Sequence, residues 1–207
     1  LTDVTGVQTC ALPICGAVLL DGGDPALMRN RERAAECGYL TQNPGDFLFH
    51  DTVEEEIGYT PRLLGRGEDG GAARLLDAWG LARLAGRNPR ELSAGERQCV
   101  ALGGAMAACP RLLLLDEPTR GQDPLLKRRL ASMLEAAAAD GASVLLVTQD
   151  LGFAAGCAGR VVVLSGGRVA AEGPACAVLA GSPFDPPQAG RLFRRFGERA
   201  AAKAPAP

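Results

Sequence analysis

Two adjacent acids, Asp116 and Glu117, are the side chains of this sequence best placed to do chemistry. They follow four leucines, Leu112–Leu115, which predict a parallel strand buried on both faces. Open α/β sheets bind ligands at the carboxyl ends of their strands, where these acids would lie. Unpaired carboxylates are costly to bury, so the pair needs a cation or a proton-transfer task. We expect Asp116 to hold Mg²⁺ on nucleotide phosphates and Glu117 to polarise an attacking water as general base; the alternative is an ordinary acidic turn.

A second candidate segment, Leu92–Gln98 (LSAGERQ), begins where a helix is predicted to start. Ser93 lies 23 positions before Asp116. A serine and a glycine at a helix N-terminus expose unpaired N–H groups and a positive dipole, which suits a phosphate. Taken alone, Ser93 is better explained by a plain helix cap. The order of the two motifs, LSAGERQ and then LLLLDEPT (Leu112–Thr119), favours phosphate binding.

In this order the motifs resemble those of the ABC ATPase family. The family signature LSGGQ corresponds to Leu92–Glu96, and its Walker B strand corresponds to Leu112–Asp116. The resemblance implies an α/β fold, a P-loop NTPase (RecA-like) parallel sheet with an inserted helical subdomain, and it implies ATP and Mg²⁺ as ligands. It also implies that Ser93, Gly95 and Glu96 contact the ATP of a second ABC ATPase subunit across a head-to-tail homo- or heterodimer.

Other matches follow in the order of the family. Gln42 resembles the Q-loop glutamine, which reaches Mg²⁺ and the attacking water; a turn glutamine is the alternative. Thr119–Pro124 resembles the D-loop, which places Asp123 near the dimer interface. The Glu-Pro-Thr-Arg-Gly form and the stretch Val147–Leu164 are similar to energy-coupling-factor ATPases, which drive uptake of vitamins and transition-metal ions.

Two departures from the family pattern affect the expected activity. Gln149 stands where the family has its switch histidine, and it can donate a hydrogen bond but cannot become a cation near neutral pH. We expect slower hydrolysis, or a weak half-site in an asymmetric pair.

No G-x-x-x-x-G-K-[ST] pattern occurs, although in the family this phosphate loop precedes a strand such as Ala17–Leu20. We therefore expect a chain that lacks the N-terminal phosphate-loop portion and cannot bind ATP in the usual way. His50 lies on the wrong segment to replace the switch histidine and is expected in a surface loop.

The N-terminal run Val4–Ile14 resembles the conceptual translation of a sequencing-library adapter. An ordinary strand is the alternative, and the absence of a basic lead and a cleavage pattern argues against a signal peptide. We expect residues 1–15 to be a non-native scar.

The remaining chain divides by pattern into a core, an inserted helical part and an extension. The predicted domains are 16–45 with N-terminal strands and the Q-loop, 46–100 as the helical subdomain with the signature, 101–180 as the RecA-like core, and 181–207 as a partly disordered extension with a short helix at Arg191–Phe196. The predicted strands are 17–20, 38–42, 112–115 and 142–148, with a hairpin over 160–170, and the predicted helices are 25–37, 72–84, 93–107 and 124–138.

Composition limits the classes of partner. Hydrophobic residues make up 47% of the chain and the formal net charge is -2, which argues against a nucleic-acid partner. No apolar run approaches the roughly 20 residues that span a bilayer, so any work at a membrane would be done through partner subunits. The resemblance implies that these are transmembrane transporter subunits, which hold the chain at the cytoplasmic face of the cell membrane. Phe47–Phe49 suits either a groove for a partner helix or local core packing. A DNA-repair or ribosomal ABC protein and a degenerate partner-binding cassette are the alternative functions.

Overall fold

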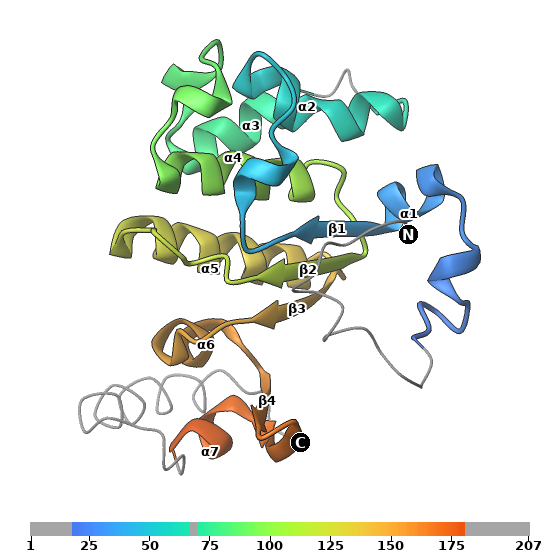
Figure 1. The fold of residues 1–207 in the computed structure, drawn as a ribbon, viewed down its shortest axis with the longest axis vertical. Coiled ribbons are helices and arrows are strands. Elements are labelled where there is room, and N and C mark those ends of the chain that lie inside the picture. Colours follow the sequence, from blue (N-terminus) through green and yellow to red (C-terminus); the bar gives the residue numbers. More distant parts are fainter. Residues whose placement is uncertain (1–17, 67–69, 181–207) are drawn as a thin grey trace.

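The computed structural model describes residues 18–66 and 70–180. A three-stranded sheet lies at its centre, in the order β1-β2-β3, and both pairs of neighbouring strands are parallel (Figure 1). The strands are β1 (Cys37–Leu40), β2 (Leu112–Asp116) and β3 (Ser143–Val147). Their arrows point the same way in Figure 1, so the residues that follow the three strands share one edge of the sheet. The predicted α/β parallel fold is confirmed.

The described part of the chain contains seven α-helices. They are α1 (Asn30–Glu36), α2 (Val53–Leu63), α3 (Gly71–Trp79), α4 (Ala94–Met106), α5 (Pro124–Ala139), α6 (Leu151–Cys157) and α7 (Ala175–Ala180). In Figure 1, α2, α3 and α4 gather beyond β1, whereas α5 runs along the sheet and α6 lies beyond β3. Short 3-10 helices occur at 25–27, 44–47, 82–84 and 89–91. No helix among the described residues is long and apolar enough to cross a membrane.

Polar side chains fix where the main helices begin. The hydroxyl of Thr52 accepts from the N–H of Glu55 at the start of α2, and Ser93 caps α4 in the same way. Asp123 accepts from two N–H groups of the first turn of α5, which has a proline at its start. Each such cap satisfies N–H groups that have no partner within the helix, which is worth about 1 kcal/mol. The predicted starts of α4 and α5 are therefore confirmed.

One face of the sheet carries the core. Its residues pack with α4 and α5 in one apolar cluster, and on β2 these are Leu113 and Leu115, which are 1% and 2% exposed. β1 approaches α4 closely at Gly38, where an added Cβ would overlap the carbonyl oxygen of Ala105.

The opposite face is open among the described residues. Tyr39, Leu145 and Val147 are 52%, 58% and 58% exposed. The prediction that Leu112–Leu115 is buried on both faces is therefore wrong, because alternate residues of this run are only half-buried.

A separate antiparallel hairpin follows the parallel sheet. It consists of β4 (Arg160–Ser165) and β5 (Arg168–Pro174) and confirms the predicted hairpin. The predicted strand 17–20 is wrong for its described residues, because Val18 and Leu19 are exposed and only an isolated bridge joins Leu20 to Gly23. The predicted scar at 1–15, the extension at 181–207 and its helix at Arg191–Phe196 lie outside the described residues.

Candidate functional site

The predicted site residues of three different strands meet at one edge of the sheet. Gln42 follows β1, Asp116 ends β2, and Gln149 follows β3. Register brings the strand ends together, since Leu40 lies opposite Leu115 and Asp116 lies opposite Val147. Gln42 is exposed there, and no hydrogen bond joins it to the acids among the described residues. The edge is where ligands of open α/β sheets bind.

Asp116 has the surroundings of a cation ligand. It is half-buried at the carboxyl end of β2. Within the described part of the chain, its carboxylate takes part in no hydrogen bond or ion pair. A carboxylate in this setting is stabilised by a cation, and Mg²⁺ is usually held by one or two carboxylates together with phosphate and water. No group of three or more His, Cys, Asp and Glu side chains forms a metal cage among the described residues. The half-buried carboxylate of Asp116 would suit Mg²⁺ that is shared with a phosphate ligand.

Glu117 is fixed by both its backbone and its side chain. Its φ is +49°, and its N–H donates to the carbonyl of Val147 at 2.8 Å. The hydroxyl of Thr148 donates to Glu117 Oε2 at 3.1 Å, and the main-chain N–H of Gln149 donates to Oε1 at 2.9 Å. The Gln149 side chain is exposed. The contact from position 149 therefore comes from its backbone and not from the side chain that replaces the family histidine.

The segment after β3 is tied to two helices through Asp150. Asp150 Oδ1 accepts from the N–H of Phe153 at 2.9 Å at the start of α6, and Oδ2 accepts from Lys127 Nζ of α5 at 2.6 Å. Burial opposes ionisation of Asp150, but its pKa still lies below the ordinary value. The pKa is lowered by the hydrogen bond from Lys127, by the N–H of Phe153, by the charge of Lys127 and by the hydroxyl of Thr119. Asp150 is therefore a stable anion that anchors this segment.

The signature residues form the first turn of α4. The Ser93 hydroxyl accepts from the Glu96 N–H at 3.3 Å and donates to Glu96 Oε2 at 2.8 Å, so the two residues make a capping box. The hydroxyl and N–H of Ser93, together with Arg83, lower the pKa of Glu96. A Cβ added at Gly95 would lie 3.0 Å from the carbonyl oxygen of Gly121. The signature turn is therefore packed closely against the predicted D-loop.

The D-loop continues this contact into the core. Its buried Gln122 donates from Nε2 to Cys99 Sγ of α4 at 3.7 Å. Burial raises the pKa of the Cys99 thiol to about 12, so this sulfur stays protonated at neutral pH. Asp123 itself uses Oδ1 to cap α5 and is exposed. This hydrogen bond joins α4 to the loop before α5, and no sequence pattern indicated it.

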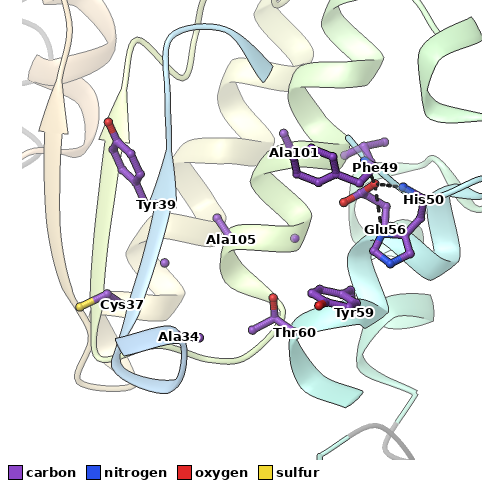
Figure 2. A pocket seen from close by; sticks show the side chains of 13 residues that line it. Ala34, Cys37, Tyr39, Phe49, His50, Glu56, Tyr59, Thr60, Ala101 and Ala105 are labelled. Carbon is purple, nitrogen blue, oxygen red and sulfur yellow. Dashed lines mark hydrogen bonds and ion pairs between the residues drawn. The ribbon is translucent and has the colours of Figure 1, made fainter. Parts of the chain in front are cut away.

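A separate hollow of about 560 Å³ lies beside β1, bounded by α1, α2 and α4. Figure 2 shows Phe49, His50, Glu56 and Tyr59 around one end of it. The buried carboxylate of Glu56 accepts from the N–H groups of Phe49 and His50 at 2.6 and 2.8 Å, and the His50 ring lies 4.7 Å from that of Tyr59. His50 lies in the loop before α2, as predicted, but its side chain is half-buried in this cluster and not fully on the surface. Leu48 enters the core, which agrees with the predicted core packing, and Phe49 is 68% exposed at the hollow; the alternative of a groove for a partner helix stays a prediction.

Comparison with known proteins shows which family the chain belongs to. The sequence profile of the family described as ABC transporter matches residues 7–120, just over half of the chain. A putative ABC transporter ATP-binding protein of Clostridium tetani is 34% identical over 86% of this chain and 41% of its own length. The nickel import ATP-binding protein NikO of Rhodobacter capsulatus is 37% identical over 84% of this chain and 69% of its own length.

Solved structures agree with the sequence relatives. A dimeric post-hydrolysis structure of the ATP-binding cassette MJ0796 with ADP and Pi has a TM-score of 0.70 at 25% identity, covering 79% of this chain and 75% of that chain. The structure of cbiO1 from Clostridium perfringens, part of the ABC transporter complex cbiONQ, has a TM-score of 0.68 at 25% identity, covering 88% of this chain and 77% of that chain.

The fold and its likeness to these cassette structures define an α/β protein of the P-loop NTPase class. Within that class, the chain belongs to the ABC transporter family and carries its ATP-binding domain. It spans less than half the length of the Clostridium tetani relative.

Proposed function

We propose that this chain is the ATP-hydrolysing subunit that powers an ABC transporter. The observation that carries the proposal is the meeting of Gln42, Asp116, Glu117 and Gln149 at the carboxyl edge of one parallel sheet. ATP is the substrate in this proposal. The half-buried Asp116, which has no partner among the described residues, holds Mg²⁺ together with Gln42, and the ion supplies charge neutralisation on the phosphates.

Glu117 serves as the general base toward the attacking water. A carboxylate offers about four acceptor positions, and the two donors that hold Glu117 leave positions free to accept a proton. Gln149 contributes a hydrogen-bond donor toward the γ-phosphate side of the site. Because it stays neutral, we expect slower hydrolysis than a histidine would support.

Ser93, Gly95 and Glu96 act in trans on the ATP of a second ABC ATPase subunit in a head-to-tail dimer, and Asp123 lies near that interface. The N-terminus of α4, a helix of 13 residues, presents N–H groups and a positive dipole suited to a phosphate. Close packing of Gly95 on Gly121 supports joint placement of the signature and the D-loop at one surface.

The transported cargo in this proposal belongs to energy-coupling-factor uptake, that is, vitamins or transition-metal ions. The support is the Glu-Pro-Thr-Arg-Gly form of residues 117–121, the relative NikO and the neighbour cbiO1. Transmembrane transporter subunits would dock in the hollow beside β1, where Phe49 and Tyr59 are exposed and Glu56 lies at its wall. They would hold the chain at the cytoplasmic face of the cell membrane.

ATP hydrolysis by the assembled pair tests this proposal. The chain is mixed with a complete cassette subunit of the same kind, and phosphate release is measured for Ser93→Ala and for Glu117→Gln. Loss of about 100-fold or more with Glu117→Gln is expected if this chain's own acids do chemistry. Val18→Ser, a change at an exposed residue that is not among the proposed site residues, is the control.

The alternative is a degenerate cassette that binds partners without hydrolysing ATP itself. The neutral side chain of Gln149 favours it. Under this alternative, Ser93→Ala lowers hydrolysis by the complete partner while Glu117→Gln leaves it unchanged. Hydrolysis that depends on neither residue would overturn both functions.

A further inference from the structure

The Thr148 side chain connects the proposed general base to the segment after β3. Its hydroxyl oxygen lies 3.1 Å from Glu117 Oε2 and accepts from the N–H of Asp150 at 3.0 Å. Because the oxygen already accepts a hydrogen bond on one side, its own proton is available to the carboxylate. Thr148 and Glu117 are both half-buried, so the contact is partly shielded from water.

The hydroxyl is itself held in a fixed place. Asp150, which donates to it, is clamped by the N–H of Phe153 in α6 and by Lys127 of α5 at 2.9 and 2.6 Å. On the other side, the backbone of Glu117 is bound to Val147, the last residue of β3. A hydrogen-bonded path therefore runs from two helices through one threonine hydroxyl to the carboxylate.

We infer that Thr148 is a positioning residue for Glu117, and this inference rests on the proposed function of Glu117 as general base. Thr148 fixes Oε2, and the main-chain N–H of Gln149 fixes Oε1. Any residue other than proline at position 149 supplies that N–H. The replacement of histidine by glutamine at 149 therefore leaves the orientation of Glu117 intact, and the hydroxyl at 148 becomes the side-chain group on which this orientation depends.

A purely structural role predicts a different outcome. If the contact only joined β2 to the segment after β3, its loss would weaken the fold and lower the amount of active protein. A positioning role instead lowers kcat at unchanged KM for ATP, because the base is displaced while substrate contacts remain. Misplacement of a catalytic group by about 1 Å costs about 100-fold in rate.

The test compares Thr148→Val with Thr148→Ser in the assembled ATPase. Valine keeps the shape and removes the hydroxyl, whereas serine keeps the hydroxyl. We expect Thr148→Val to lower kcat by about 10-fold to 100-fold with KM changed less than about twofold, and Thr148→Ser to restore most of the rate. Ser143→Ala, which removes an exposed hydroxyl at the other end of β3, is the matched control and should match the wild type.

A second measurement uses the chain alone and needs no hydrolysis. Amide hydrogen exchange at Gln149 reports the bond to Glu117 Oε1, and we expect it to rise about 10-fold in Thr148→Val and to stay near the wild type in Thr148→Ser. A Thr148→Val enzyme with wild-type kcat, beside an inactive Glu117→Gln enzyme, overturns the inference and leaves the proposed function standing. Hydrolysis that does not depend on Glu117 overturns both.

Discussion

At the scale of residues, Glu117 combines the proposed chemical role with a backbone conformation that favours glycine. Its φ of +49° lies in the left-handed region, which costs a residue with a Cβ about 1–2 kcal/mol. The N–H bond to Val147 and the two donors on the carboxylate hold it there. The strained turn directs the carboxylate toward the segment after β3, so this conformation serves the site and not the stability of β2.

The strain can be measured by comparing Glu117→Gly with Glu117→Ala. Both changes remove the carboxylate and its two hydrogen bonds, but only alanine keeps the Cβ that the left-handed conformation disfavours. We expect the glycine variant to have the higher free energy of unfolding by about 1 kcal/mol in urea denaturation. At Asp116, which lies in regular β2, the alanine variant should instead have a higher free energy of unfolding than the glycine variant. An alanine variant at 117 that is at least as stable as the glycine variant would contradict the strain.

Single residues of the site were predictable to different degrees. Asp116, Glu117 and Ser93 could be found because short contiguous motifs contain them. The contact of Thr148 with Glu117 could not, because the two are 31 positions apart and meet only through the register of β2 with β3. The hydrogen bonds of Glu56 in the hollow depend likewise on how α2 packs against the loop before it.

At the scale of elements, α5 and α6 are joined by the ion pair of Lys127 with Asp150. The side chains are 35% and 27% exposed, so water screens the pair less than a surface pair. Both helices begin at an aspartate that caps the first turn, and such starts can be predicted from sequence. The pairing of the helices could not be predicted, because spacing along the chain does not indicate which side chains meet across elements.

This ion pair predicts a pH dependence of stability. Because the pKa of Asp150 is below its ordinary value in the folded chain, the stabilisation is complete above about pH 4 and is lost as the pH falls through the folded-state pKa. We expect Lys127→Met to lower the free energy of unfolding by about 0.5–1.5 kcal/mol at pH 7, and the difference from wild type to shrink as the pH falls below about pH 4. The exposed pair of Arg160 with Glu172 is the control, and Arg160→Met should cost no more than about 0.5 kcal/mol. A Lys127→Met deficit that stays constant over this range would rule out the linkage.

At the scale of the whole molecule, the sheet is covered on one face and open on the other among the described residues. Parallel strands usually have helices on both faces, and the continuous apolar runs of β2 and β3 suggest the same here. Sequence pattern shows that both sides of these strands are apolar, but it does not show which side receives a helix. In the structure α4 and α5 pack on the face of Leu113, whereas Leu145 lies on the other face.

This asymmetry predicts unequal costs for the same truncation on the two faces. Leu113 is 1% exposed and Leu145 is 58% exposed, although they lie on adjacent strands. We expect Leu113→Ala to lower the free energy of unfolding by about 2–5 kcal/mol, because it removes buried methyl groups and leaves a cavity. Leu145→Ala should cost less than about 1 kcal/mol, since little buried apolar area is lost. Urea denaturation of the two variants and the wild type decides between these values. Equal costs at the two positions would mean that the face of Leu145 is covered in solution, which would contradict the arrangement described above.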